Sequence, residues 1–182
     1  MTPTGGSLNL SDSNVGGQKG RNVRDNIFVI NAILNSITKQ NADAHDLQIY
    51  DVDKCFDSMW LHECVNALFE AGLNNDKLPL LFMSNSTAQV AIKTATGITD
   101  RISILKIVMQ GTVWGSLFCV ALMDKLVKLV NKDENLLFYY KNSVPIQPLE
   151  MVDDILTVTN VENTLIMNER VNTFIEHKNL RL

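Results

Sequence analysis

The stretch Glu150-Met151-Val152-Asp153-Asp154-Ile155-Leu156-Thr157-Val158-Thr159 places two adjacent carboxylates between two short apolar runs. Its β-branched residues favour extended strands, whereas an Asp-Asp pair favours a tight turn, so the stretch predicts a β-hairpin with the acids at its tip. Because successive side chains on a strand point to opposite faces, the two acids are not expected to do the same job. The same pattern also fits a solvated turn, so a functional interpretation needs a third acid on another apolar strand.

Such an acid lies upstream, where Leu47-Gln48-Ile49-Tyr50-Asp51-Val52 predicts a strand that ends at Asp51. This strand and the hairpin are both apolar enough to lie side by side in one sheet, with their acids at one edge. Carboxylates gathered in this way raise each other's pKa unless cations neutralise them. Mg²⁺ suits such a site because it takes oxygen ligands and keeps waters that phosphate oxygens can displace. Two such ions about 3.5–4 Å apart can activate a 3′-hydroxyl and stabilise a leaving pyrophosphate, so acids on adjacent strands, with basic segments elsewhere, point to nucleotidyl transfer. This chemistry fits polymerases, cyclases and some nucleases alike.

Composition favours one globular domain, or part of a larger one, since 46% of the 182 residues are hydrophobic and 20% are charged. The formal charge of −4 does not suggest a nucleic-acid binder. Positive charge is segregated, however, because residues 89–108 carry a net +2. Three cysteines without metal-ligand spacing favour a reducing compartment. No apolar run reaches the length of a membrane span and no signal-peptide pattern is present, so we expect a soluble intracellular protein without a membrane partner.

Apolar spacing and turn residues predict the remaining elements. Helices are expected over about 27–38, 61–71, 78–84, 117–129 and 164–176. Further strands are expected over 89–93, 101–108 and 136–140, with a β-hairpin joining the first two and a proline-bounded turn at 144–148. This order predicts an α+β fold with an antiparallel main sheet, helices packed on one face, and the other face free to cradle nucleic acid.

A basic, glycine-rich segment, residues 16–25, leads into the first helix. Lys19, Arg21 and Arg24 against Asp25 give it a local charge of +2. Backbone N–H groups and the helix dipole favour anions at such a position, so the segment can meet a phosphate. An ordinary solvated loop is the alternative interpretation.

Four segments resemble motifs of reverse transcriptases. Tyr50-Asp51-Val52-Asp53-Lys54-Cys55-Phe56-Asp57 resembles the first catalytic motif, Asp-x-x-x-x-Phe-Asp. Gln110-Gly111, followed by a small-residue loop and an apolar helix, is similar to the second, Gln-Gly-x-x-x-Ser-Pro. Met151-Val152-Asp153-Asp154 is similar to the third, aromatic-x-Asp-Asp, and residues 17–25 resemble the fingers segment of retrotransposon enzymes without long terminal repeats. The four segments occur in the family's order and spacing over about Gly16 to Thr159. The chain therefore resembles a fragment of the reverse transcriptase domain of a retrotransposon without long terminal repeats.

The resemblance implies an RNA-directed DNA polymerase, a nucleotidyltransferase that extends a DNA primer on an RNA template from deoxynucleoside triphosphates. It implies two Mg²⁺ ions as cofactors, with Mn²⁺ as a substitute. Asp51 and Asp153 would be the main metal ligands, supplemented by the Val52 carbonyl, and Asp154 would be the secondary catalytic acid.

Further roles follow from the same resemblance. Phe56 would lie under the incoming sugar as a steric gate against a 2′-hydroxyl, although an aromatic after a strand is also a common core residue. Gln110 and Gly111 would border the nascent base pair, where glycine permits close backbone approach. Template phosphates would be contacted by Lys19, Arg21 and Arg24.

The sequence departs from the family pattern at several places. Met151 replaces the usual aromatic, and Ser116 stands where the second motif has proline. The motif that grips the triphosphate is expected upstream of Met1, and the thumb beyond Leu182. We therefore expect residues 1–45 to be an N-terminal loop with part of the fingers, and residues 46–182 to be a polymerase palm. Both would come from a longer polyprotein, whose other parts would be partners.

Three functional hypotheses remain. The first is a reverse transcriptase palm, of which this isolated fragment is expected to have little or no activity. The second is a catalytically inactive or truncated remnant that at most binds RNA. A cyclase-like palm shares the acids but does not explain the Gln-Gly loop or the basic segment at residues 16–25.

Overall fold

The structure is a computed structural model that describes residues 8–16, 18, 20–39, 45–74, 76–103, 106, 113–141 and 143–182. Its helices are α1 (Val23–Lys39), α2 (Cys55–Ser58), α3 (Leu61–Glu70), α4 (Leu78–Ser86), α5 (Val113–Asn131) and α6 (Thr164–His177), with 3-10 turns η1 (Glu134–Leu136) and η2 (Val161–Asn163). Its strands are β1 (His45–Asp51), β2 (Gln89–Val90), β3 (Lys93–Thr94), β4 (Gly97–Ile98), β5 (Ile102–Ser103), β6 (Phe138–Tyr140), β7 (Val144–Ile146), β8 (Leu149–Met151) and β9 (Asp154–Asn160). No helix in these ranges is both long and apolar enough to cross a membrane.

The main sheet is antiparallel and has the strand order β1-β9-β8. The pairing of β1 with β9 runs from His45 opposite Asn160 to Asp51 opposite Asp154, while β8 and β9 form the hairpin that contains the Asp pair. The predicted placement of the upstream acidic strand beside the hairpin is confirmed. Alternating apolar residues set this register, because a one-residue slip would expose Ile155, which is buried.

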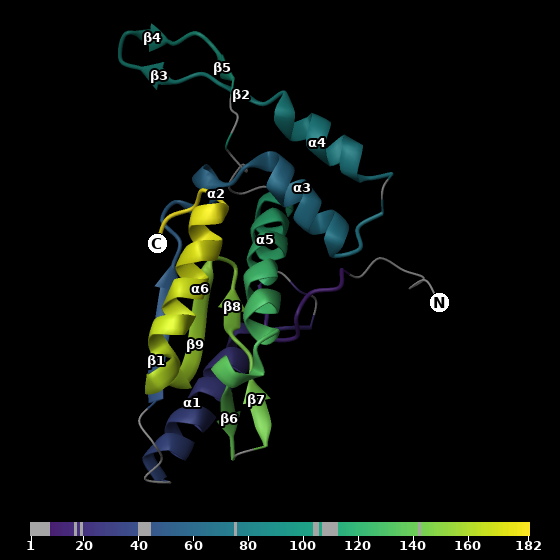
Figure 1. Ribbon diagram of the computed structural model, residues 1–182. Coiled ribbons are helices and arrows are strands. Elements are labelled where there is room, and N and C mark those ends of the chain that lie inside the picture. Colours follow the sequence, from purple (N-terminus) through teal and green to yellow (C-terminus); the bar gives the residue numbers. More distant parts are fainter. Residues whose placement is uncertain are drawn as a thin grey trace.

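Helices cover both faces of the sheet, so the prediction of helices on one face only is wrong (Figure 1). Tyr50 and Ile155 point into the main core, to which α5 and α6 contribute. The next residue in β9, Leu156, and Val158 point the opposite way, toward Ile33 of α1. The physical reason is that β9 carries apolar residues at both parities, and each set needs its own cover.

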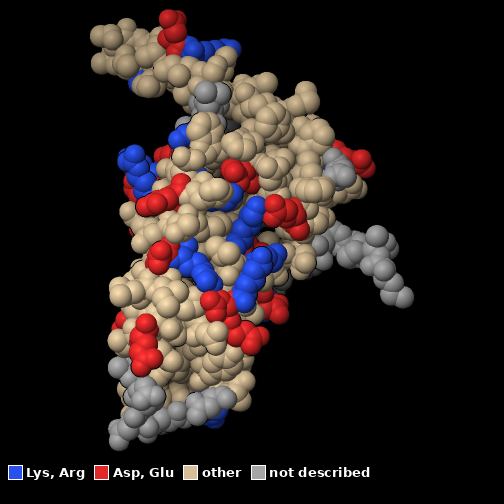
Figure 2. All heavy atoms as spheres, viewed as in Figure 1, with Lys and Arg blue, Asp and Glu red and all other residues tan. Residues whose placement is uncertain are grey.

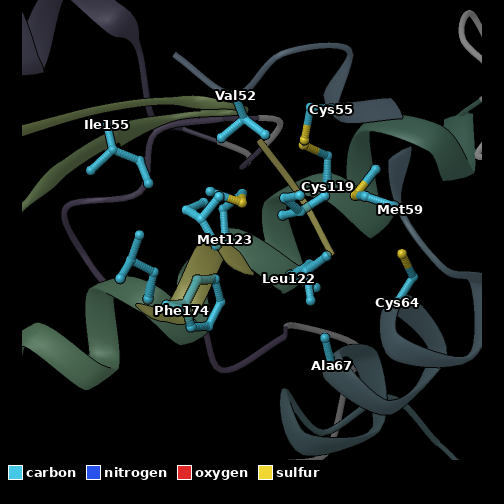
Figure 3. Packing of buried hydrophobic residues seen from close by; sticks show 14 of the residues in the cluster. Val52, Cys55, Met59, Cys64, Ala67, Cys119, Leu122, Met123, Ile155 and Phe174 are labelled. Atoms are coloured by element: carbon cyan, nitrogen blue, oxygen red, sulfur yellow. The ribbon is translucent and has the colours of Figure 1, made fainter. Parts of the chain in front are cut away.

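The main core lies around α5, which is buried along most of its length. Leu122 and Met123 of this helix are fully enclosed, and Figure 3 shows them among Val52, Cys119 and Phe174. Helix α5 packs against β8 of the sheet and against α3. As predicted, α3 ends before Gly72, whose φ of +92° lies in the left-handed region.

The strands predicted over 89–93, 101–108 and 136–140 do not join the main sheet; those that the structure describes form separate two-stranded sheets. β2 pairs with β5 and β3 with β4 in a two-stranded arm that projects from the body together with α4 (Figure 1). The predicted pairing of residues 89–93 with 101–108 is confirmed at Gln89–Val90 and Ile102–Ser103, while residues 104–105 and 107–108 lie outside the described residues. Residues 144–146, expected as a turn, form β7 and pair with β6, because a proline is tolerated on an edge strand.

Candidate functional site

Three carboxylates meet at one end of the main sheet. Asp51 is the last residue of β1 and stands opposite Asp154, the first residue of β9. Asp153 lies in the two-residue turn between Met151 and Asp154, which are themselves paired. Directly opposed residues of an antiparallel pair share a face, so Asp51 and Asp154 project to the same side.

This geometry refines the expected division of labour between the two turn acids. Strand alternation predicts that Asp153 and Asp154 point to opposite faces, with Asp153 as the main ligand, and the structure pairs Asp154 in register with Asp51. The strand alternation rule does not apply to Asp153, because this residue belongs to the turn and not to a strand. The proposed roles of Asp51, Asp153 and Asp154 in catalysis stay predictions.

The carboxylates of Asp51 and Asp154 interact electrostatically with that of Asp153. Partial burial raises the pKa of Asp153 above the ordinary aspartate value, and the carboxylates of Asp154 and Asp51 raise it further. The backbone N–H of Asp153 opposes these effects by hydrogen bonding to the charged form. A cation at this place would relieve the repulsion between the acids.

The face of the sheet that carries Asp51 and Asp154 is open to solvent beside them. Both carboxylates are exposed, as are the side chains of Ile49 (69%) and Met151 (43%). Farther along the same face, Leu156 and Val158 are covered by α1. The surface of this face beside the acids is therefore accessible to a large polar substrate.

The oxygen donors suit a hard cation, but they are not preassembled. Among the described residues, no three His, Cys, Asp or Glu side chains form a group that could hold a metal ion. The Val52 carbonyl, the expected additional ligand, accepts a hydrogen bond from the Cys55 N–H at 3.2 Å. Its second lone pair is available by the ordinary capacity of a carbonyl oxygen.

Hydrogen bonds and core packing fix residues 53–55, which follow β1 and Asp51. Lys54 adopts φ +48° at the start of α2, and Asp53 N–H donates to the Arg181 carbonyl at 2.8 Å. The thiols of Cys55 and Cys119 lie 3.2 Å apart. Figure 3 shows both cysteines among the packed core residues. Their contact and their burial raise the pKa of Cys119, so this thiol remains protonated.

The other predicted site residues lie in different surroundings, and some lie outside the described residues. Phe56, on α2, is partly buried and packs against the main core while keeping an accessible part. Arg21 forms an ion pair with Asp12, and Arg24 is exposed at the start of α1. Lys19, Gln110 and Gly111 lie outside the described residues.

Sequence reasoning missed the polar groups that support the turn. Val152 precedes Asp153 with φ +64°, an unusual conformation for a β-branched residue. Glu150 is completely buried and its Oε1 accepts a hydrogen bond from Asn14 at 2.8 Å. The available signal was an acid at position 150 between apolar neighbours, because a charged residue within an apolar strand usually needs a partner.

Positive and negative groups alternate on the face formed by α5 and α6, as Figure 2 shows. Ion pairs account for much of this pattern: Lys125 with Glu70, Lys128 with Asp124, Arg170 with Asp133 and Lys178 with Glu63. This face is therefore not a uniformly basic surface of the kind that binds nucleic acid. The end of the main sheet that carries Asp51 and Asp154 is the better candidate for a surface that binds nucleic acid.

No protein-family model matches the sequence, and no curated protein matches it. Solved structures of telomerase do resemble it. Telomerase from Candida Tropicalis in complex with a TWJ fragment of telomeric RNA matches with a TM-score of 0.62 and 16% identity, over 91% of this chain and 28% of that chain. The apo enzyme from Candida Tropicalis matches with 0.61 and 13%, over 93% and 32%. Telomerase from Candida albicans, also with a TWJ fragment, matches with 0.56 and 16%, over 92% and 29%.

These matches show the fold alone, because the identities are low. The chain has a mixed helix-and-strand fold similar to part of telomerase, a reverse transcriptase-type polymerase. It spans about a third or less of the length of the three structures.

Proposed function

We propose that this chain is the palm, with part of the fingers, of an RNA-directed DNA polymerase that extends a DNA primer on an RNA template. The observation that carries the proposal is the in-register pairing of Asp51 with Asp154, with Asp153 in the adjoining turn. The likeness to telomerase supports it, because that fold belongs to a polymerase of the same general kind. The order of the four motif-like segments favours an origin in a retrotransposon without long terminal repeats.

In this proposal Asp51, Asp153 and the Val52 carbonyl hold Mg²⁺, with Mn²⁺ as a substitute, and Asp154 adds negative charge beside them. When bound, two such ions activate a 3′-hydroxyl and stabilise the leaving pyrophosphate. The raised pKa of Asp153 fits this role, because a carboxylate crowded by others gains from a cation. The open surface near Ile49 leaves room for the primer end.

The other predicted residues complete the proposal. Phe56 would contact the sugar of the incoming deoxynucleoside triphosphate from its partly exposed side. Gln110 and Gly111 would border the new base pair. Arg24 would contact a template phosphate, as would Lys19, while Arg21 would first have to exchange its ion pair with Asp12.

The alternative is a catalytically inactive remnant that at most binds RNA. Within the described residues, the absence of a preassembled three-ligand group favours it. The ion pair between Arg21 and Asp12 favours it too, because a paired guanidinium is less available to a phosphate. The two hypotheses differ in whether the acids bind a divalent cation productively.

Titration with Mn²⁺, followed by paramagnetic broadening of backbone NMR signals, tests the site directly. Signals of residues 51–54 and 152–154 should broaden first, and Asp51→Asn or Asp153→Asn should weaken binding on the order of tenfold or more, because each removes a charged ligand. Asp100→Asn, an exposed acid on the projecting arm, should leave binding unchanged. Equal binding by the parent and by Asp51→Asn would refute the metal site.

Primer extension on an RNA template, with Mg²⁺ or Mn²⁺, tests the polymerase. Extension that Asp51→Asn and Asp153→Asn abolish, and that Asp100→Asn retains, would establish the enzyme. Cation binding without extension fits either hypothesis, because little or no activity is expected from this fragment by itself.

A further inference from the structure

A segment near the N-terminus runs alongside the strand that leads into the acid turn. The Val15 N–H donates to the Glu150 carbonyl at 3.0 Å, and the Glu150 N–H donates to the Ser13 carbonyl at 3.2 Å. These bonds form a parallel bridge centred on Asn14. Residues 11–16, hereafter the support loop, thus extend the edge of the main sheet beside β8. The edge strand is held from outside as well as by β9.

The side chain of Glu150 anchors this loop from within. It is 0% exposed, and its Oε1 accepts a hydrogen bond from the Asn14 side-chain amide at 2.8 Å. Within the described residues its Oε2 has no hydrogen-bond partner. Burial raises the pKa of Glu150 well above the ordinary value, and the nearby Asp124 carboxylate raises it further. Burial therefore favours the neutral, protonated form of the Glu150 carboxyl over the charged form.

A second buried acid secures the other end of the loop. Asp124 of α5 accepts a hydrogen bond from the Ser11 N–H at 2.7 Å and pairs with Lys128 at 2.7 Å. Asp124 is 1% exposed, and the ion pair with Lys128, whose side chain is 42% exposed, offsets the cost of burying this carboxylate. The loop is consequently fixed both to β8 and to the central helix.

The loop also contacts the acid turn itself. A Cβ built on Gly16 would lie 2.8 Å from the Val152 backbone nitrogen and 3.0 Å from a methyl group of Val120. Only a glycine lets the loop pass this close to the turn. Val152, with φ +64°, holds a conformation that a β-branched residue adopts only under constraint from its surroundings.

We propose that the support loop and the buried Glu150 side chain are positioning elements, which hold the turn at Val152 and Asp153 in the conformation that places Asp153 beside Asp51. Glu150 does not touch the substrate in this arrangement, and it acts through Asn14 and the strand β8. The relevance of this positioning to cation binding rests on the proposed function, whereas the positioning itself does not.

Amide hydrogen exchange measured by NMR tests the proposal. Glu150→Ala removes the acceptor for Asn14, and Gly16→Ala pushes against Val152. Both should speed exchange at Val15, Glu150 and Asp154 on the order of tenfold relative to amides in the centre of α5, because a buried donor is left unpaired or displaced. Glu150→Gln keeps an oxygen acceptor in the same place and should restore exchange to within about twofold of the parent. Glu169→Ala, an exposed acid on α6, is the matched control.

Equal acceleration at the turn and in α5 would overturn the proposal, since Glu150 would then contribute only to global stability. Unchanged exchange in both variants would overturn it as well. Should Glu150→Ala fail to fold, Gly16→Ala and Glu150→Gln decide the question. Mn²⁺ broadening is recorded on the same samples, with weaker binding expected in Glu150→Ala and parental binding in Glu150→Gln. If the parent binds no Mn²⁺, the proposed function fails, and the exchange data alone decide the positioning.

Discussion

Glu150 illustrates how a single side chain can serve a site that it does not enter. Burial raises the pKa of its carboxyl well above the ordinary value, and the nearby Asp124 raises this pKa further. The Asn14 amide donates to its Oε1, and the neutral form avoids the cost of burying an uncompensated charge. The residue is therefore better described as a polar core group than as part of the acidic cluster.

The raised pKa of Glu150 predicts a pH dependence of stability. The unfolded chain releases this proton near the ordinary value of 4.5, whereas the folded protein keeps it to higher pH. Folding therefore becomes less favourable as pH rises from 4.5 toward the folded pKa, by about 1.4 kcal/mol for each unit that separates the two values. Groups that face Glu150 are Asp124 and Lys128 of α5, Cys55 of α2, and Asn14.

Glu150→Gln should remove this contribution, because a glutamine does not titrate. Thermal unfolding of the parent and the variant, measured at several pH values, should show a gap that widens in favour of the variant above pH 4.5 and then becomes constant. A gap that does not change with pH would show that Glu150 has an ordinary pKa in the folded protein.

At the scale of elements, α1 determines how much of the sheet stays accessible. Its Ile33 is fully buried against Phe138 and Val158, so the helix closes one end of the face that carries Asp51. Asn26 of the same helix donates to the Glu150 carbonyl at 3.2 Å, which links α1 to β8. The helix thus covers the sheet at Val158, whereas Ile49 beside the acids stays exposed.

Replacement of Ile33 tests this packing. Ile33→Ala should lower the free energy of unfolding by about 2–5 kcal/mol, because it removes a fully buried side chain and leaves a cavity. Phe28→Ala on the same helix should cost no more than about 0.5 kcal/mol, because Phe28 is 76% exposed. Urea denaturation of both variants provides the comparison. Similar losses in the two variants would show that α1 does not dock through Ile33.

The sequence patterns predict some contacts between elements but not others. The pairing of β1 with β9 was predictable, because each segment alternates or runs apolar and ends or begins at an acid. The second covered face was not, because single-sequence patterns mark β9 as buried without saying which helix covers Leu156. The support of the turn by Asn14 and Gly16 depends on residues more than a hundred positions away, which no local pattern connects.

At the scale of the whole molecule, the projecting arm is the least enclosed part. Several of its apolar side chains are exposed on α4 and on the two-stranded extension: Leu80, Phe82, Met83, Val90, Ile92, Ile98 and Ile102. Within the described part of the chain, the short strands of the arm pair with each other, and they extend away from the core (Figure 1). An exposed apolar surface of this kind favours association.

We therefore expect the purified chain to self-associate through the arm as its concentration rises. The double variant Leu80→Lys with Ile98→Lys replaces two side chains that are 71% and 72% exposed, so it should preserve the fold while opposing association. The concentration at which association begins should rise on the order of tenfold, which corresponds to about 1.4 kcal/mol. Leu165→Lys on α6, at a position that is 80% exposed and away from the arm, is the control and should associate like the parent. Sedimentation velocity over a concentration series distinguishes these outcomes. A parent chain that remains monomeric throughout, or a control that dissociates as fully as the double variant, would exclude the arm as the surface of association.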